Sequence, residues 1–122
     1  MTSTDTVPAE TLHRWQLRGQ KLIDTLLTDA RKLNLPPLAW TLAVSGAVTG
    51  SADQMNYTPD EQREAVRRWA AHVGAPVDTE HTTDGREELY AGWKITVSGE
   101  VGPVHGCFRA TIPAHRNGTW SR

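Results

Sequence analysis

The sequence predicts an α+β fold, a two-layer sandwich with two helices on one face of a mostly antiparallel sheet. Two stretches, 8–33 and 58–73, carry apolar residues at helical spacing. A third, Trp93 to Ile112, alternates apolar and polar residues as strands do. The elements follow the order α-β-β-α-β-β-β, for which two helices on one sheet face is an economical packing.

The composition favours a single soluble domain over residues 1–122. Hydrophobic residues make up 38% of the 122, with five tryptophans, which is enough for a modest core. The formal net charge of −1 gives no overall basic signal for nucleic acid. Cys107 is the only cysteine, which excludes an intrachain disulfide and favours a reducing compartment. No signal-peptide pattern and no apolar run of the ~20 residues that span a bilayer occurs, so we expect a cytoplasmic protein, of bacterial type, with no membrane partner.

The first helix is predicted over 8–33, after a frayed N-terminus at 1–7. Pro8 suits the start of a helix, because its missing N–H costs nothing there. Asn34 can cap the C-terminal end. Gly19 interrupts the apolar stripe, which predicts close packing against a strand or another helix. The stripe consists of Leu12, Trp15, Gly19, Leu22, Leu26, Ala30 and Leu33.

A hairpin is predicted over 38–55, with a first strand from Leu38 to Val48 and a turn at Thr49-Gly50. One side of this strand is apolar, and the other is small and uncharged. Exposed sheet faces usually carry charged residues that resist association. We therefore expect another chain or the protein's own tail to cover this smooth side. Its residues are Thr41, Ala43, Ser45, Ala47 and Thr49.

The second helix, predicted over 58–73, has a strong start signal. Thr58 can cap it, Pro59 fits the first helical position, and Glu61 completes a capping box. A glycine follows its last apolar residue, as is typical of a helix end. The helix is therefore expected to bury Ala65, Val66, Trp69, Ala70 and Val73.

A three-stranded meander is predicted over 77–112. Its first turn is indicated by Asp84-Gly85. A two-residue loop there would place Asp78 and Glu80 on the inward face. This conflict predicts a bulge, a longer loop or an edge strand.

The second hairpin of the meander is predicted to turn at Gly102-Pro103. That register puts every apolar residue of the two strands on one face. The expected pairs are Val101 with Val104, Val97 with Phe108, Ile95 with Ala110 and Trp93 with Ile112.

Two segments of the chain resemble each other. Residues 40–48 and 93–101 align without gaps and share Trp, Val, Ser, Gly and a final Val. One interpretation is a duplicated helix-plus-hairpin unit with a pseudo-twofold sheet. The other is that two core strands converged on similar composition, since two copies are too few to define a repeat family.

The predicted register also brings candidate catalytic residues together. Glu100 would face His105, and Cys107 would lie two residues along the same face. A carboxylate, an imidazole and a thiol could form a nucleophilic set. The favoured interpretation is an exposed sheet face with a salt bridge, because no loop that could form an oxyanion hole is evident.

Metal and cofactor sites are not predicted. His81, Glu80, His105, Cys107 and His115 are available, but none of the usual metal-ligand spacings occurs. Glycine-rich phosphate loops are also absent from the sequence.

A nucleic-acid site could form at the basic tail, 113–122. Arg109, Arg116 and Arg122 could hold phosphates while Trp120 stacks on a base. The balanced overall charge favours a solvated tail, or one that docks Trp120 on a protein surface.

From these patterns we expect a small non-enzymatic binding or adaptor module. It would act through its exposed sheet face, on a protein partner or on a second copy of itself. The first alternative is a small enzyme or ligand-binding protein that uses His105, Cys107 and Glu100. The second is a weak nucleic-acid binder that uses the C-terminal tail.

Overall fold

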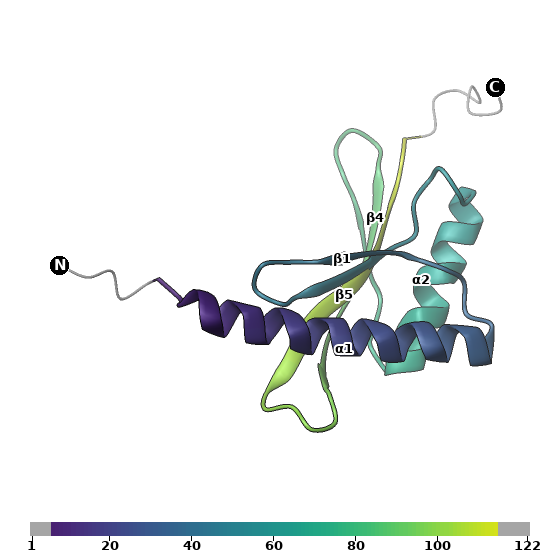
Figure 1. The fold of residues 1–122 in the computed structure, drawn as a ribbon. Coiled ribbons are helices and arrows are strands. Elements are labelled where there is room, and N and C mark those ends of the chain that lie inside the picture. The colour runs from purple at the N-terminus through teal and green to yellow at the C-terminus, as the bar shows by residue number, and fades with distance from the viewer. Residues whose placement is uncertain (1–5, 115–122) are drawn as a thin grey trace.

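The computed structural model describes residues 6–114 and confirms the predicted fold class and element order (Figure 1). Both helices pack on the same face of a five-stranded sheet, because their buried side chains share one apolar cluster with the sheet. The elements are α1 (Ala9–Leu33), β1 (Ala39–Leu42), β2 (Val48–Ser51), α2 (Pro59–Val73), β3 (Asp78–His81), β4 (Glu87–Thr96) and β5 (Pro103–Ile112).

The strand order is β1-β2-β5-β4-β3, so the predicted meander over the last three strands is present. All neighbours are antiparallel except β2 and β5, which are parallel. A twofold axis normal to the sheet, relating one hairpin to the other, would make these two central strands antiparallel. The sheet therefore lacks the pseudo-twofold arrangement that a duplication predicts.

Helix α1 packs closely on the β1–β2 turn, as Gly19 predicted. A Cβ on Gly19 would lie 2.5 Å from the carbonyl oxygen of Gly46, so only glycine fits at this contact. Leu22 and Leu26 are buried, while Leu33 at the end of the predicted stripe is largely exposed. Asn34 caps the helix in the left-handed conformation, with φ 55°.

Helix α2 begins with the predicted capping box. The Thr58 hydroxyl accepts a hydrogen bond from the Glu61 amide, and the Glu61 carboxylate accepts one from the Thr58 amide. Four of the five residues expected in its core face are buried, and Val73 is partly buried. Gln62 is also fully buried, which the apolar pattern did not predict.

The core is built around four aromatic rings from both layers. Trp69 of α2 packs against Trp40 and Phe108, with ring centroids 5.4 and 5.3 Å apart. Trp93 also packs against Phe108, with ring centroids 5.3 Å apart. The indole N–H of Trp69 donates to the Pro36 carbonyl, which attaches the loop after α1 to α2. Figure 1 shows α2 beside the C-terminal end of α1, where His72 and Asp29 pair at 2.9 Å.

The predicted strand from Leu38 to Val48 was wrong, because the chain turns in its middle. Strand β1 ends at Leu42, and the Ala43 amide donates to the Ala47 carbonyl across the turn. Gly46 has a φ of +85°, which a strand residue does not adopt. The expected turn at Thr49-Gly50 instead lies inside β2.

The predicted register of the last hairpin was also wrong, by six residues. The ladder ends at Thr96 and Pro103, and Trp93 pairs with Gly106 instead of Ile112. Gly99 and Gly102 both have positive φ in the connecting loop. Contacts with α1 hold this loop: Arg18 donates to the Val101 carbonyl, and Lys21 pairs with Glu100. The error is an even number of residues, so the residues that remain paired face as predicted, whereas Val101, predicted to face inward, lies in the loop and is 91% exposed.

Strand β3 is a fully exposed edge strand that pairs only with β4. His81 pairs with Glu87, and the Thr82 amide donates to the Arg86 carbonyl across the loop. The loop is longer than two residues. A longer loop was one of the three arrangements expected to keep Asp78 and Glu80 off the inward face.

Candidate binding face of the sheet

The sheet surface that points away from the helices is the open face. Ala91, Trp93 and Phe108 are buried under the helices, so the alternate residues of β4 and β5 point the opposite way. On this face, residues that pair with one another across four neighbouring strands form a row with short side chains, which we call the strip. This row consists of Thr41, Thr49, Cys107 and Gly92.

Two further rows flank the short one. On one side Lys94 pairs with His105, and on the other Tyr90 pairs with Arg109. All four of these side chains are exposed. The open face therefore has a low strip bordered on both sides by long polar or aromatic side chains.

Tyr90 lies across the strip on the β4 side. A Cβ on Gly92 would be 3.0 Å from Cε2 and 3.1 Å from the hydroxyl oxygen of the Tyr90 ring. The ring thus lies alongside the bare backbone of Gly92, and Tyr90 remains 50% exposed. An aromatic side chain in this position presents apolar area to any chain that contacts the sheet.

Two shallow grooves meet on this face at Thr49. One, of about 750 Å³, lies over the strip and is lined by Tyr90, Lys94, His105 and Cys107 among others. The other, of about 610 Å³, runs toward the ends of β2 and β5 and is lined by Ser51, Arg109, Thr111 and Arg86 among others.

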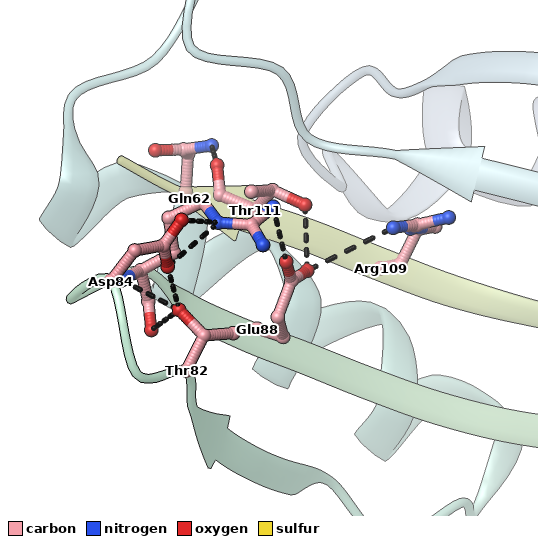
Figure 2. Close-up of polar contacts among 7 residues, drawn as sticks. Gln62, Thr82, Asp84, Glu88, Arg109 and Thr111 are labelled. Carbon is pink, nitrogen blue, oxygen red and sulfur yellow. Dashed lines mark hydrogen bonds and ion pairs between the residues drawn. The ribbon is translucent and has the colours of Figure 1, made fainter. Parts of the chain in front are cut away.

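A polar cluster borders the second groove (Figure 2). The Glu88 carboxylate accepts a hydrogen bond from the Thr111 hydroxyl at 2.7 Å. Arg86 and Arg109 approach the same carboxylate at 3.4 and 3.8 Å. Hydrogen bonds from Thr82 and Arg86 hold the pKa of Asp84 below its usual value.

The residues of the expected nucleophilic set are only partly brought together. His105 and Cys107 share the open face, as predicted. Glu100 lies in the β4–β5 loop, where it pairs with Lys21 of α1, and Lys94 stands opposite His105 in its place. The Cys107 sulfur is 3.9 Å from the Thr49 hydroxyl oxygen and partly buried.

The smooth side predicted for the first strand is only partly a sheet surface. Thr41 and Thr49 pair on the open face, and Ala47 lines the larger groove. Ala43 and Ser45 lie in the β1–β2 turn and are exposed. Arg109 lies on the open face, whereas Arg116 and Trp120 fall outside the described residues, as do His115 and Arg122.

Sequence reasoning did not single out Tyr90 and Lys94. The available signal was an aromatic residue at a position that the alternation makes solvent-facing. Residues 6–114 contain no group of three or more His, Cys, Asp or Glu side chains arranged to hold a metal ion.

Comparisons with protein-family models, with curated proteins and with solved structures found no match to this chain. Neither helix in the described part of the chain has the length and apolar character needed to cross a membrane.

Proposed function

We propose that the protein is a non-enzymatic binding module whose open face contacts another protein chain. The observation that carries this proposal is Tyr90, half-exposed beside Gly92 on a sheet face that no described helix covers. Tyrosine is enriched among the residues that dominate binding energy in protein interfaces.

The shape of the face supports a macromolecular ligand. Small-molecule sites are concave and bury most of their ligand's surface. The groove over the strip is wide, open to solvent and floored by strand backbone at Gly92 and Gly106. A broad, shallow surface of this kind suits another protein chain better than a small molecule.

The enzymatic alternative has less support. It needs a carboxylate beside His105, and the carboxylate expected there, Glu100, is paired with Lys21 on α1. His105 instead faces Lys94, whose ammonium group cannot accept a hydrogen bond from the imidazole N–H as a carboxylate does. The nucleic-acid alternative depends on Arg116 and Trp120, which lie outside the described residues.

Site-specific photo-crosslinking in cells tests the proposal. A photoreactive phenylalanine analogue replaces Tyr90 in one version of the full chain and Leu17 in a control. Leu17 is 63% exposed on α1, the helical side of the molecule. We expect a discrete crosslinked band from the Tyr90 position only. The mass of the crosslinked band shows whether the bound chain is a second copy of this protein or a different protein.

Two outcomes would overturn the proposal. One is the absence of any protein adduct from the Tyr90 position. The other is the same set of bands from Tyr90 and Leu17, which would show nonspecific contact.

A further inference from the structure

We infer that the chain bound by the open face presents an acidic segment, which lies in the strip between the Lys94–His105 pair and the Tyr90–Arg109 pair. This inference rests on the proposed function, because it names the chemistry of the partner at that same face. It is carried by the distribution of charges around the strip.

Lys94 provides the cation on one border of the strip. It is exposed on the open face, and no carboxylate among the described residues forms an ion pair with it. Its cross-strand partner is His105, whose ring adds a further hydrogen-bonding group on the same side of the strip. This border therefore offers an ammonium group that the protein itself does not neutralise.

Arg109 provides a cation on the other border. Its only ion-pair partner among the described residues is Glu88, at the long distance of 3.8 Å, and its side chain is 50% exposed. A guanidinium carries five N–H donors in a fixed fork that matches a carboxylate. Most of these donors are free to meet a carboxylate from another chain.

The acids of the open face lie in the Tyr90 row or farther from Lys94, and one of them, Asp53, lines the second groove. Asp78 pairs with Tyr90, and Glu80 pairs with Glu88, both on the β3 side. Among residues 6–114, no acidic side chain lines the groove over the strip. An acidic segment would thus be attracted into the strip and repelled from the β3 edge, which fixes its position.

The spacing of the two borders suits one segment of chain. Lys94 and Tyr90 are four residues apart on β4, which corresponds to ~13 Å at ~3.3 Å per residue. The Tyr90 ring lies over Gly92 and takes up part of this width, so an extended segment fits the strip, whereas a helix of ~10–12 Å with its side chains does not. A single acidic segment can therefore reach Lys94 from one side and Arg109 from the other.

A nucleic acid is the less favoured occupant. Its phosphates repeat along the whole strand and require a continuous basic track. On the open face, Glu88, Glu80 and Asp78 interrupt the basic residues on the β3 side. The acidic protein segment is the ligand that this mixed pattern accommodates.

Fluorescence anisotropy on the full chain tests the inference. The probe is a labelled short peptide in which glutamate alternates with alanine. Its lysine-for-glutamate counterpart and an oligothymidylate of matched length serve as comparisons. We expect the glutamate peptide alone to bind, with an affinity that falls as salt is added.

Charge-reversal variants locate the binding. Lys94→Glu should weaken binding of the glutamate peptide about tenfold or more, because it places a repulsive charge at the strip. Arg14→Glu is the matched control, since Arg14 is exposed on α1 and has no ion pair among the described residues. It should change the affinity by less than about twofold. Thermal unfolding of both variants verifies that each remains folded.

Several results would overturn the inference. Equal binding of the lysine peptide, equal effects of the two charge reversals, or tighter binding of oligothymidylate would each contradict an acidic protein segment. If Tyr90 still crosslinks to a protein in any of these cases, the proposed function stands and only the partner's chemistry is wrong. Absence of crosslinks at Tyr90 contradicts the proposed function itself.

Discussion

The ring of Tyr90 lies against Gly92, two residues further along β4, on the side of the sheet that faces away from the helices. On the other side, the ring of Trp93 lies against Gly106 in the neighbouring strand. Each glycine makes room for an aromatic ring. One ring is exposed and the other is in the core, so the two glycines are predicted to differ in their importance for stability.

Gly106→Ala should destabilise the protein by about 1–3 kcal/mol or more, as expected for overpacking a core. The new Cβ would lie 2.2 Å from Cη2 of Trp93 and 2.5 Å from the Val48 carbonyl oxygen. Gly92→Ala is the matched control. The three atoms nearest to its Cβ all belong to the exposed Tyr90 ring, which can rotate away, so the loss should stay below about 1 kcal/mol. Urea unfolding of both variants compares them, and equal losses would show that the two faces are misassigned.

Trp93→Ala should lower the free energy of unfolding by about 3–5 kcal/mol, the usual cost of deleting a buried aromatic side chain. Trp93 is 9% exposed and packs on Phe108. The adjacent Lys94→Ala, on the open face, should cost no more than about 0.5 kcal/mol. A Trp93→Ala loss below about 1 kcal/mol in chemical denaturation would contradict the placement of this ring in the core.

Gln62→Glu should be more damaging than Gln62→Met. The buried Gln62 amide donates to the carbonyls of Ala52 and Thr111, at 2.9 and 3.1 Å, and so joins α2 to the ends of β2 and β5. Methionine removes these hydrogen bonds at a cost of about 1–3 kcal/mol. A carboxylate would face two carbonyl oxygens and add the cost of a buried unpaired charge, about 3–5 kcal/mol.

The pH dependence of this pair of variants provides the check. Protonation of the introduced carboxylate restores one donor, so Gln62→Glu should recover stability relative to Gln62→Met as the pH is lowered. Unfolding curves at pH 7 and in mild acid measure this difference. A constant difference between the two variants would rule out the proposed role of the amide donors.

Glu87→Gln tests the ion pair that joins α2 to β4. Arg63 donates to the Glu87 carboxylate at 2.8 to 3.2 Å, and these hydrogen bonds hold the pKa of Glu87 below its ordinary value of 4.5. A carboxyl group with a lowered pKa in the folded state stabilises the fold above its unfolded-state pKa. That contribution is lost as the pH falls through the folded-state pKa.

At pH 7 we therefore expect Glu87→Gln to lose about 1–3 kcal/mol of unfolding free energy. Its deficit relative to the unmodified protein should shrink below pH 4.5, the ordinary value for the group. Glu64→Gln, at an exposed position of α2 with no ion pair among the described residues, is the control and should show little deficit at any pH. A deficit for Glu87→Gln that stays constant down to low pH would contradict the argument.

The faces of the strands could be predicted from the sequence, but their lengths could not. Alternation placed Trp93 and Phe108 inward and Cys107 outward, and all three are so placed. The two Ser-Gly pairs, at 45–46 and 98–99, end the pairing of their strands. Ser-Gly is itself a turn signal, and in both pairs the glycine has positive φ. The continuous alternation around these pairs concealed that signal.

Local sequence patterns could not predict which residues lie side by side on the open face, because this depends on how distant strands pair. Thr49 lies beside Cys107 because β2 and β5 are parallel neighbours, although 58 residues separate them. The loop at Glu100 is drawn to α1 by Lys21, a contact between distant parts of the chain. Cys107 and Arg109 could therefore be named from the sequence as site candidates, whereas Tyr90, Lys94 and the neighbours of each residue could not.

The reactivity of Cys107 tests whether the open face binds another chain, because this single thiol lies in the floor of that face. The measurement is its alkylation rate in the purified, diluted chain and in an extract of the cells that produce the protein. A Cys107→Ser, Leu17→Cys version reports on the helical side as a control. If the open face binds another chain, Cys107 is protected in the extract while the thiol at position 17 reacts at an unchanged rate. Equal alkylation rates for Cys107 in the purified protein and in the extract would contradict binding of another chain to the open face.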